Sequence, residues 1–174
     1  MSDVFAQIEQ EIPRLRRHAQ SLVRDPSSAD DLVQDCLAQA LAKSHLWQEG
    51  TDLRAWLFTI QHSQYANTVR RSARESAIVE SRDTEPSLLT PEAQFIRLEL
   101  RDLERALALL PAEQRQVLLL VGMEGLRYED VAKVLGVPVG TVSSRLSRGR
   151  DALWVLMDET DKARAERRAE TVSQ

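Results

Sequence analysis

The chain alternates segments that carry apolar residues at helical spacing with short polar breaks, a pattern that predicts an all-α fold. Residues 4–24 place apolar side chains every three or four positions, and Pro13 within them predicts a kink or a fresh start. A second helix is expected to follow, with Ser27 and Asp30 arranged as in a capping box. Its buried stripe is predicted to contain Leu32, Val33, Cys36, Leu37, Ala40 and Leu41.

Four polar side chains of this second helix lie outside the stripe. They are Asp30, Asp31, Gln34 and Asp35. The helix dipole favours acids in a first turn, which gives Asp30 and Asp31 a structural reason. The same reason accounts poorly for Asp35.

A break at residues 44–52 predicts a loop, and helical spacing resumes from Leu53 to about Arg74. Aromatic side chains beside arginines suit single-stranded DNA, because bases stack on rings while guanidinium groups neutralise the backbone. Aromatics at helical spacing, such as Trp56 and Phe58, are more often core residues, so both interpretations stay open. The residues expected to pack are Leu53, Trp56, Leu57, Ile60 and Tyr65.

The segment from Glu75 to about Leu89 is polar and has no periodic apolar face, which makes it the best domain boundary. A helix is expected to start near Pro91 and to end at Pro111. Its apolar positions are Phe95, Leu98, Leu103, Leu107 and Leu110. Residues 112–123 are predicted to form the most buried helix of the second domain. We expect domains at 1–75 and 92–160, a linker at 76–91, and a polar tail at 161–174 that frays.

The spacing of residues 128–150 predicts two short helices joined by a tight turn, with Gly136 supplying the left-handed residue that ends the first. In the second helix Val142, Leu146 and Leu153 form a narrow apolar stripe. Polar residues occupy its opposite face and flanks: Thr141, Ser143, Ser144, Arg145, Ser147, Arg148 and Arg150. Hydroxyl and guanidinium groups suit base edges and phosphates in a major groove, which favours a DNA-reading helix-turn-helix over a merely solvated basic face.

Composition indicates a globular chain, since the 174 residues are 43% hydrophobic and 29% charged. No apolar run is long enough to span a membrane and no signal peptide is recognisable, so we expect a cytoplasmic protein without membrane insertion. The single cysteine, Cys36, is expected to fill a core position. His18, His45 and His62 lack ligand spacing and there is no phosphate loop, so we expect no metal, no cofactor and no catalytic residue.

The net charge of −4 conceals a segregation of charge along the chain. Residues 53–74 and 141–150 contain arginines and no acid, whereas residues 75–104 contain eight acids against three arginines, a balance of −5. Two basic surfaces are therefore separated by an acidic middle. Such a chain should bind free DNA weakly, because the acidic segments oppose approach to the phosphates.

Two blocks in this order resemble the extracytoplasmic-function sigma factors of bacterial RNA polymerase, the minimal two-domain class. The first block is SADDLVQDCLAQAL followed by DLRAWLFTIQHSQYANTVRR; the second is LPAEQRQVLLLVGMEGLRYEDVAKVLGVPVGTVSSRLSRGRDAL. The resemblance covers residues 5–157. It implies two small helical domains, sigma region 2 as a three- to four-helix bundle and sigma region 4 as a helix-turn-helix, joined by a flexible acidic linker.

The resemblance also implies binding roles. Region 2 would bind the clamp helices of the largest subunit of core RNA polymerase through Asp30, Asp31, Gln34 and Asp35. A base flipped from the −10 element would enter a pocket at the 44–52 loop, with Trp47, at low cost because the duplex is already opening. The −10 strand would be lined and its backbone held by Thr59, Ser63, Asn67, Arg70, Arg71 and Arg74. Region 4 would bind the β flap and read the −35 element through the polar face of its second helix.

Two positions depart from the family's pattern. His62 and Ser63 stand where relatives often have Arg-Asn, so the −10 base preference does not transfer. Ser143 stands where a basic residue is common, which shifts −35 readout towards Arg148 and the neighbouring serines. A bidentate contact of Arg148 with guanine would contribute about 1–3 kcal/mol of discrimination.

The partners implied by the resemblance are core RNA polymerase, promoter DNA and an anti-sigma factor whose helices occupy the polymerase-binding surfaces. We expect the two domains to pack closely when inhibited and to separate on polymerase. A stand-alone helix-turn-helix regulator is the alternative, with residues 1–75 as a sensing or dimerising module. The acidic linker and the unpaired readout helix argue against it.

Overall fold

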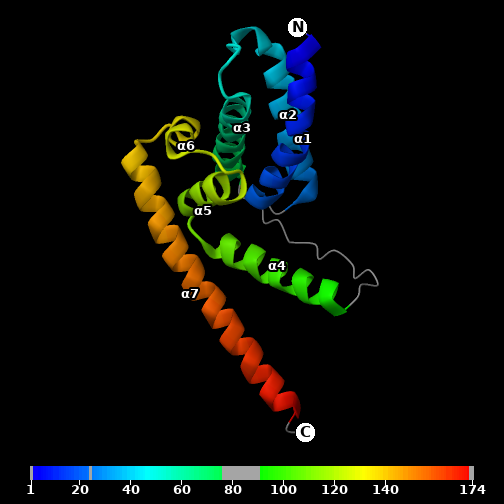
Figure 1. Ribbon diagram of the computed structural model, residues 1–174, viewed down its shortest axis with the longest axis vertical. Coiled ribbons are helices and arrows are strands. Elements are labelled where there is room, and N and C mark those ends of the chain that lie inside the picture. Colours follow the sequence, from blue (N-terminus) through cyan, green and yellow to red (C-terminus); the bar gives the residue numbers. More distant parts are fainter. Residues whose placement is uncertain (1, 24, 76–90, 173–174) are drawn as a thin grey trace. The chain divides into compact units, whose positions relative to one another are not determined.

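The computed structural model describes residues 2–23, 25–75 and 91–172, and within these ranges every regular element is a helix (Figure 1). The elements are α1 (Ser2–Leu22), α2 (Pro26–Ala42), the 3-10 turn η1 (Ser44–Leu46), α3 (Leu53–Glu75), α4 (Pro91–Leu109), α5 (Ala112–Leu118), the π-helical turn η2 (Leu119–Met123), α6 (Tyr128–Leu135) and α7 (Val139–Val172). The predicted all-α fold is confirmed. None of the described helices is both long and apolar enough to cross a membrane.

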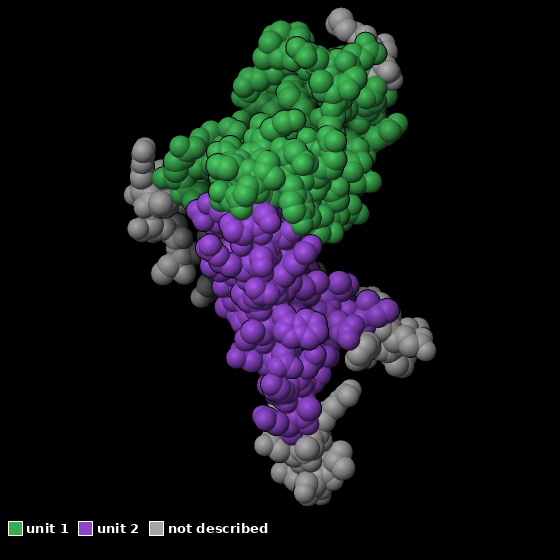
Figure 2. Space-filling view, turned by 60° about the vertical axis from the view of Figure 1, so that its left-hand side comes forward, with its two compact units in different colours: residues 1–83, 119–142 green, residues 84–118, 143–174 purple. Residues whose placement is uncertain are grey.

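Two compact units interleave along the sequence (Figure 2). Unit 1 comprises residues 1–83 and 119–142, and unit 2 comprises residues 84–118 and 143–174. The helix-turn-helix is thus divided, with α6 in unit 1 and most of α7 in unit 2. The domain ranges expected from the sequence remain a prediction, because residues 76–90 of the predicted linker lie outside the described part.

Helix α1 runs without interruption through Pro13, so a fresh start there is wrong, while the kink stays a prediction. Pro13 is exposed, whereas Ile8 and Leu15 on either side of it are buried in unit 1. We infer that packing on both sides of the proline outweighs the one intrahelical hydrogen bond that its ring removes.

Helix α2 starts at Pro26 and is capped by Asp25, so the predicted cap at Ser27 is wrong. The Asp25 carboxylate accepts hydrogen bonds from the Ser28 amide and hydroxyl, both at 2.8 Å. Proline is preorganised for the first helical position, which moves the start of the helix two residues upstream. The predicted stripe holds except at its edge: Leu37 is only half-buried and Leu41 is 48% exposed.

Helix α3 buries Leu53, Leu57, Phe58 and Tyr65, while Trp56 and Ile60 are half-buried. Phe58 is therefore a core residue and not a stacking platform. The Cys36 thiol lies 3.6 Å from the Leu57 carbonyl oxygen, and burial raises the pKa of this thiol to about 12. The thiol stays protonated and fills a core position, as predicted.

Helix α7 lies close to α5 within unit 2. Gly149 is buried, and a Cβ atom at this position would lie 3.0 Å from Leu118 Cδ1 and 3.3 Å from Gln114 Cβ. This approach leaves little room for any larger residue. Val117 and Leu146 are fully buried in the same unit, whereas Leu98 of α4, expected in the core, is exposed.

The polar tail is helical, since α7 continues to Val172, and its fraying stays a prediction. Arg164 pairs with Asp102 on α4, a carboxylate that is 6% exposed and also lies 3.7 Å from Arg105 Nη1. The polar tail therefore has a partner far away in sequence, which its composition alone does not reveal.

The first helix of the predicted helix-turn-helix is confirmed as α6, and Gly136 has a φ of 65° as expected. The second helix begins at Val139, directly after Pro138. The single helix predicted for residues 112–123 is instead α5 followed by the wider turn η2. Its backbone hydrogen bond from the Glu124 amide to the Leu119 carbonyl, at 3.1 Å, spans five residues.

Candidate nucleic-acid and partner interfaces

The polar face predicted on α7 divides into exposed and half-buried positions. Solvent reaches Ser143, Ser147, Arg148 and Arg150, whereas Thr141, Ser144 and Arg145 are half-buried. Val142 and Leu146 on the opposite side are buried, as predicted, and Leu153 is half-buried. The first turns of α7 thus present hydroxyl and guanidinium groups on one side, the arrangement needed to contact base edges and phosphates.

The Arg145 guanidinium forms an ion pair within the chain. Its Nη2 lies 2.9 Å from Glu113 Oε2 on α5, and its side chain is 21% exposed against 68% for the glutamate. A phosphate that takes up this guanidinium must therefore displace an exposed carboxylate. The sequence did not indicate this ion pair, because Glu113 lies 32 positions away from Arg145 on another helix.

Helix α3 presents Thr59, Ser63 and Asn67 to solvent at intervals of four residues, so they lie along one face as expected. The Thr59 hydroxyl donates to the Ala55 carbonyl at 2.8 Å, which leaves its oxygen able to accept. Arg70 folds back on the helix: its Nη2 donates to Asn67 Oδ1 at 3.3 Å. The side chains of Arg71 and Arg74 lie outside the described residues.

Trp47 lines a hollow of about 290 Å³ next to the 44–52 loop. Its indole nitrogen is buried and has no hydrogen-bond partner within the described residues. The other wall is formed by the start of α1, including the exposed ring of Phe5, which sequence reasoning missed. The complete lining is Val4, Phe5, Gln7, Ser44, His45, Trp47 and Glu49.

Helix α2 exposes all four residues of the predicted polar cluster: Asp30, Asp31, Gln34 and Asp35. The last three line a groove of about 340 Å³ together with Tyr65 and Thr68 of α3. Asp30 lies to one side, where Arg16 Nε is 3.6 Å from its carboxylate and both side chains are more than half exposed. Among the described residues, no group of three or more histidine, cysteine, aspartate or glutamate side chains could hold a metal ion.

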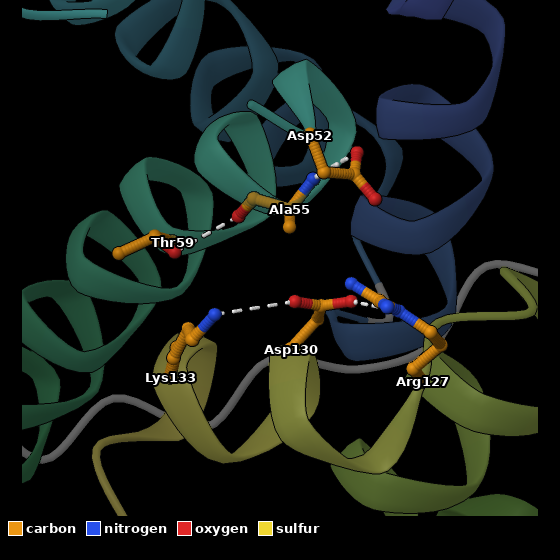
Figure 3. A network of polar contacts seen from close by, with 6 residues as sticks. All are labelled: Asp52, Ala55, Thr59, Arg127, Asp130 and Lys133. Atoms are coloured by element: carbon orange, nitrogen blue, oxygen red, sulfur yellow. Dashed lines mark hydrogen bonds and ion pairs between the residues drawn. The ribbon is translucent and has the colours of Figure 1, made fainter. Parts of the chain in front are cut away.

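Helix α6 packs on α3 within unit 1, with charged side chains facing the first turns of α3 (Figure 3). Asp130 is buried and accepts a hydrogen bond from Arg127 Nε at 2.8 Å, while Lys133 Nζ lies 3.6 Å from its other oxygen. The hydrogen bond to Asp130 raises the pKa of Arg127, as does the field of Asp52 at the start of α3. The sequence shows these opposite charges three residues apart, but it does not show that their side chains face α3.

Comparison with known proteins supports two functional regions. A family model described as the Sigma2 domain of PhyR matches residues 8–62, and one described as Sigma-70, region 4 matches residues 100–153. The chain is 40% identical over 148 residues to the ECF RNA polymerase sigma factor EcfG of Rhodopseudomonas palustris, covering 84% of this chain and 80% of that protein. It is 34% identical over 148 residues to SigL of Mycobacterium tuberculosis, covering 83% of each.

Solved structures agree with these sequence matches. The sigma factor RpoE of Bartonella quintana, solved with the anti-sigma factor NepR, superposes with a TM-score of 0.80 at 35% identity, covering 91% of this chain and 98% of that one. CnrH, solved with the cytosolic domain of CnrY, gives a TM-score of 0.68 at 25% identity, covering 90% and 88%. The resemblance found in the two sequence blocks is thus confirmed, and the chain belongs to the extracytoplasmic-function family of RNA polymerase sigma factors.

Proposed function

We propose that this sigma factor binds core RNA polymerase and reads its promoter through three exposed surfaces, on α2, on α3 with the preceding loop, and on α7. The observation that carries the proposal is the exposure of polar groups at these positions while their apolar neighbours are buried. We assign residues 1–75 to region 2, 92–160 to region 4 and 76–91 to the linker. The chain acts as a transcription initiation factor and not as an enzyme.

The α2 surface binds the clamp helices of the largest polymerase subunit. Asp31, Gln34 and Asp35 stand at one groove, so a partner that offers guanidinium or ammonium groups can pair with them. The Asp30–Arg16 pair is solvent-exposed and hence weak, which leaves this carboxylate able to change partners. This assignment supplies the role for Asp35 that helix capping does not.

The hollow beside Trp47 captures a base flipped from the −10 element. Its volume of about 290 Å³ and the aromatic side chains of Phe5 and Trp47 suit a stacked base. Thr59, Ser63 and Asn67 then line the same strand. Its backbone is held by Arg70, Arg71 and Arg74.

Helix α7 reads the −35 element while region 4 binds the β flap. Arg148 is exposed and offers a bidentate donor for guanine. Ser143, Ser147 and Arg150 are exposed beside it and contact phosphates or base edges. Thr141, Ser144 and Arg145 contribute from the half-buried flank.

An anti-sigma factor controls the chain by covering the polymerase-binding surfaces. The support is that RpoE was solved with NepR and CnrH with a domain of CnrY. The two domains pack closely in the inhibited state and separate on polymerase. Fluorescence transfer between labels on regions 2 and 4 tests this, and equal distances in both states would contradict it.

Reconstitution with core RNA polymerase tests the whole proposal. Run-off transcription from a cognate promoter, found by mapping transcripts across the source genome, should appear only when the chain is added. Asp35→Ala should weaken binding to core enzyme, whereas Glu9→Ala, which removes an exposed acid from α1, should not. Failure of the wild-type chain to bind core enzyme would contradict the proposal. Tight, sequence-specific binding of duplex DNA without polymerase would instead favour a stand-alone regulator.

A further inference from the structure

Glu124 is a buried carboxylate that none of the three proposed surfaces uses. It follows the turn η2, its side chain is 2% exposed, and neither carboxylate oxygen has a hydrogen-bond partner among the described residues. An ionised carboxylate in such a place loses its hydration without replacement, which disfavours the buried state. The ionised carboxylate of Glu124 therefore opposes the packing of this segment.

The charges that face Glu124 come from α1 and α3. Arg17, Arg14 and Arg54 attract its carboxylate and Glu11 repels it. Two of these arginines also attract Glu11, because Arg54 Nε lies 3.3 Å and Arg14 Nε lies 3.6 Å from Glu11 Oε2. The third, Arg17, is exposed to solvent, which screens its charge. Burial outweighs the arginines, and the pKa of Glu124 is raised above its ordinary value.

This carboxylate lies in the segment that joins region 4 to α1–α3 in one compact unit. Residues 119–142 belong to unit 1, where α6 packs on α3. Buried apolar side chains of the segment, Leu120, Leu126 and Val131, favour the compact arrangement. Glu124 opposes this arrangement whenever its carboxylate is ionised. Apolar burial and the buried charge thus act in opposite directions within one segment.

We propose that Glu124 is a release group: its ionised carboxylate opposes docking of residues 119–142 on α1–α3, and uptake of one proton favours docking. The inference rests on the proposed function only in that region 4 must be free to engage polymerase. Apolar packing then stabilises the docked arrangement, and the buried charge of Glu124 keeps docking reversible.

The direction of the pH effect follows from linkage. The docked form holds the proton more tightly than the open form, in which Glu124 is hydrated, so docking strengthens as pH falls. As pH rises above the ordinary glutamate value, the docking constant should decrease by up to about tenfold per pH unit, because one proton is released on opening. The decrease stops once pH exceeds the pKa of the docked form.

Fluorescence transfer in the full-length chain measures docking directly. Cysteines introduced at Gln20 on α1 and Val139 at the start of α7 provide two exposed labelling sites. Cys36 does not compete for label, since it is buried and protonated. Transfer efficiency is followed from pH 5 to pH 8.5, with circular dichroism to show that the helices persist.

Four chains are compared. The wild type should gain transfer as pH falls. Glu124→Gln, which keeps the shape without the charge, should dock at least about fivefold more tightly at pH 8 and show no titration. Glu129→Gln removes an exposed acid from the first turn of α6 and should titrate as the wild type does. Arg17→Gln removes an attractive charge and should extend the pH-dependent range to higher pH.

Two results would overturn the inference: a Glu124→Gln chain that titrates like the wild type, or one that transfers less than the wild type at pH 8. Run-off transcription with the same chains separates this inference from the proposed function. If the wild type supports promoter-specific transcription but its fluorescence transfer does not change with pH, the release group alone is refuted. The expected titrations in a chain that fails to bind core enzyme would support the release group and refute the proposed function.

Discussion

His18 and Gln61 form a buried hydrogen bond between α1 and α3, with 2.8 Å between His18 Nδ1 and Gln61 Oε1. Gln61 Nε2 donates to the Leu15 carbonyl at 2.9 Å, which turns the amide oxygen towards the histidine. Nδ1 is therefore the protonated ring nitrogen, and Nε2 has no partner in the described part of the chain. The ring also meets Phe58 edge-on, with centroids 4.9 Å apart. A polar contact thus helps to fix the register of two helices inside an apolar core.

This contact predicts acid sensitivity of region 2. Burial, partly offset by the Gln61 hydrogen bond, lowers the pKa of His18 to about 4 from 6.5. The unfolded chain therefore binds the proton more tightly, and stability falls as pH drops from 6.5 towards 4. Between pH 7.5 and pH 5 we expect His18 to remove about 2 kcal/mol from the free energy of unfolding, measured by urea denaturation.

A matched pair of variants isolates the contribution of His18. His18→Gln keeps an N–H donor without a titrating ring and should lose about 2 kcal/mol less than the wild type over the same pH interval. His45→Gln, on the exposed loop, should leave the pH dependence unchanged. Burial also lowers the pKa of His62, so a residual acid sensitivity is expected. Equal pH dependence in His18→Gln and the wild type would contradict the prediction.

The parts of this fold that sequence reasoning predicted depend on local signals. Apolar spacing placed α3, and Gly136 ended α6, because both features act within a few residues. The network of His18 and Gln61 was missed because two polar residues in a buried stripe look like interruptions of the pattern. Pro26 moved the start of α2 through its own backbone preference, which a search for capping residues overlooked.

The exposure of Arg148 was predictable from periodicity, because this residue lies opposite the buried apolar stripe of α7, whereas Ser63 was named only through the family resemblance. Periodicity does not predict which charges meet across elements. Arg145 pairs with Glu113 because α5 and α7 approach closely at Gly149, and Asp102 pairs with Arg164 across 62 positions. Such pairs depend on tertiary packing, which a single sequence does not specify.

The pair of Asp102 and Arg164 predicts that the polar end of α7 stabilises unit 2. Arg164→Met keeps the apolar stem but removes one guanidinium from a buried carboxylate, which retains Arg105 at 3.7 Å. We expect a loss of roughly 2–3 kcal/mol in the free energy of unfolding, less than for a buried charge left wholly unpaired. Asp102→Asn in the same background should recover part of this loss.

Helix α7 also supplies the control for this prediction. Lys162 lies 2.7 Å from Asp158, and both side chains are more than half exposed. Lys162→Met should therefore leave the free energy of unfolding nearly unchanged, because solvent screens this pair. If both methionine variants melted alike, the tail would not be anchored through Asp102.

Packing and readout on α7 should separate in a second pair of variants. Leu146 is buried, so Leu146→Ala should cost about 2–5 kcal/mol of stability. Arg148 is exposed, so Arg148→Ala should leave the melting temperature unchanged and weaken run-off from promoters with an intact −35 element by about tenfold. Arg97→Ala removes an exposed charge from α4 and controls for net charge. Equal melting temperatures for the Leu146 and Arg148 variants would show that the faces are assigned wrongly.

The ion pair between Arg145 and Glu113 predicts a restraint on DNA affinity. While Glu113 occupies the guanidinium, a phosphate must compete with a carboxylate 2.9 Å away. Glu113→Gln should release Arg145 to contact DNA. We expect tighter DNA binding by the holoenzyme at low salt and a salt dependence steeper by up to about 0.9, the slope for one added phosphate contact.

A double-mutant cycle assigns this effect to Arg145 and not to the loss of an acid near DNA. In an Arg145→Ala background, Glu113→Gln should leave the salt slope unchanged, because no guanidinium remains to be released. Glu129→Gln removes a comparable exposed acid from α6 and should not alter the slope in either background. Stability should change by less than about 1 kcal/mol throughout, since the glutamate is mostly exposed. The same steepening in both backgrounds would mean that Glu113 acts on DNA by general repulsion.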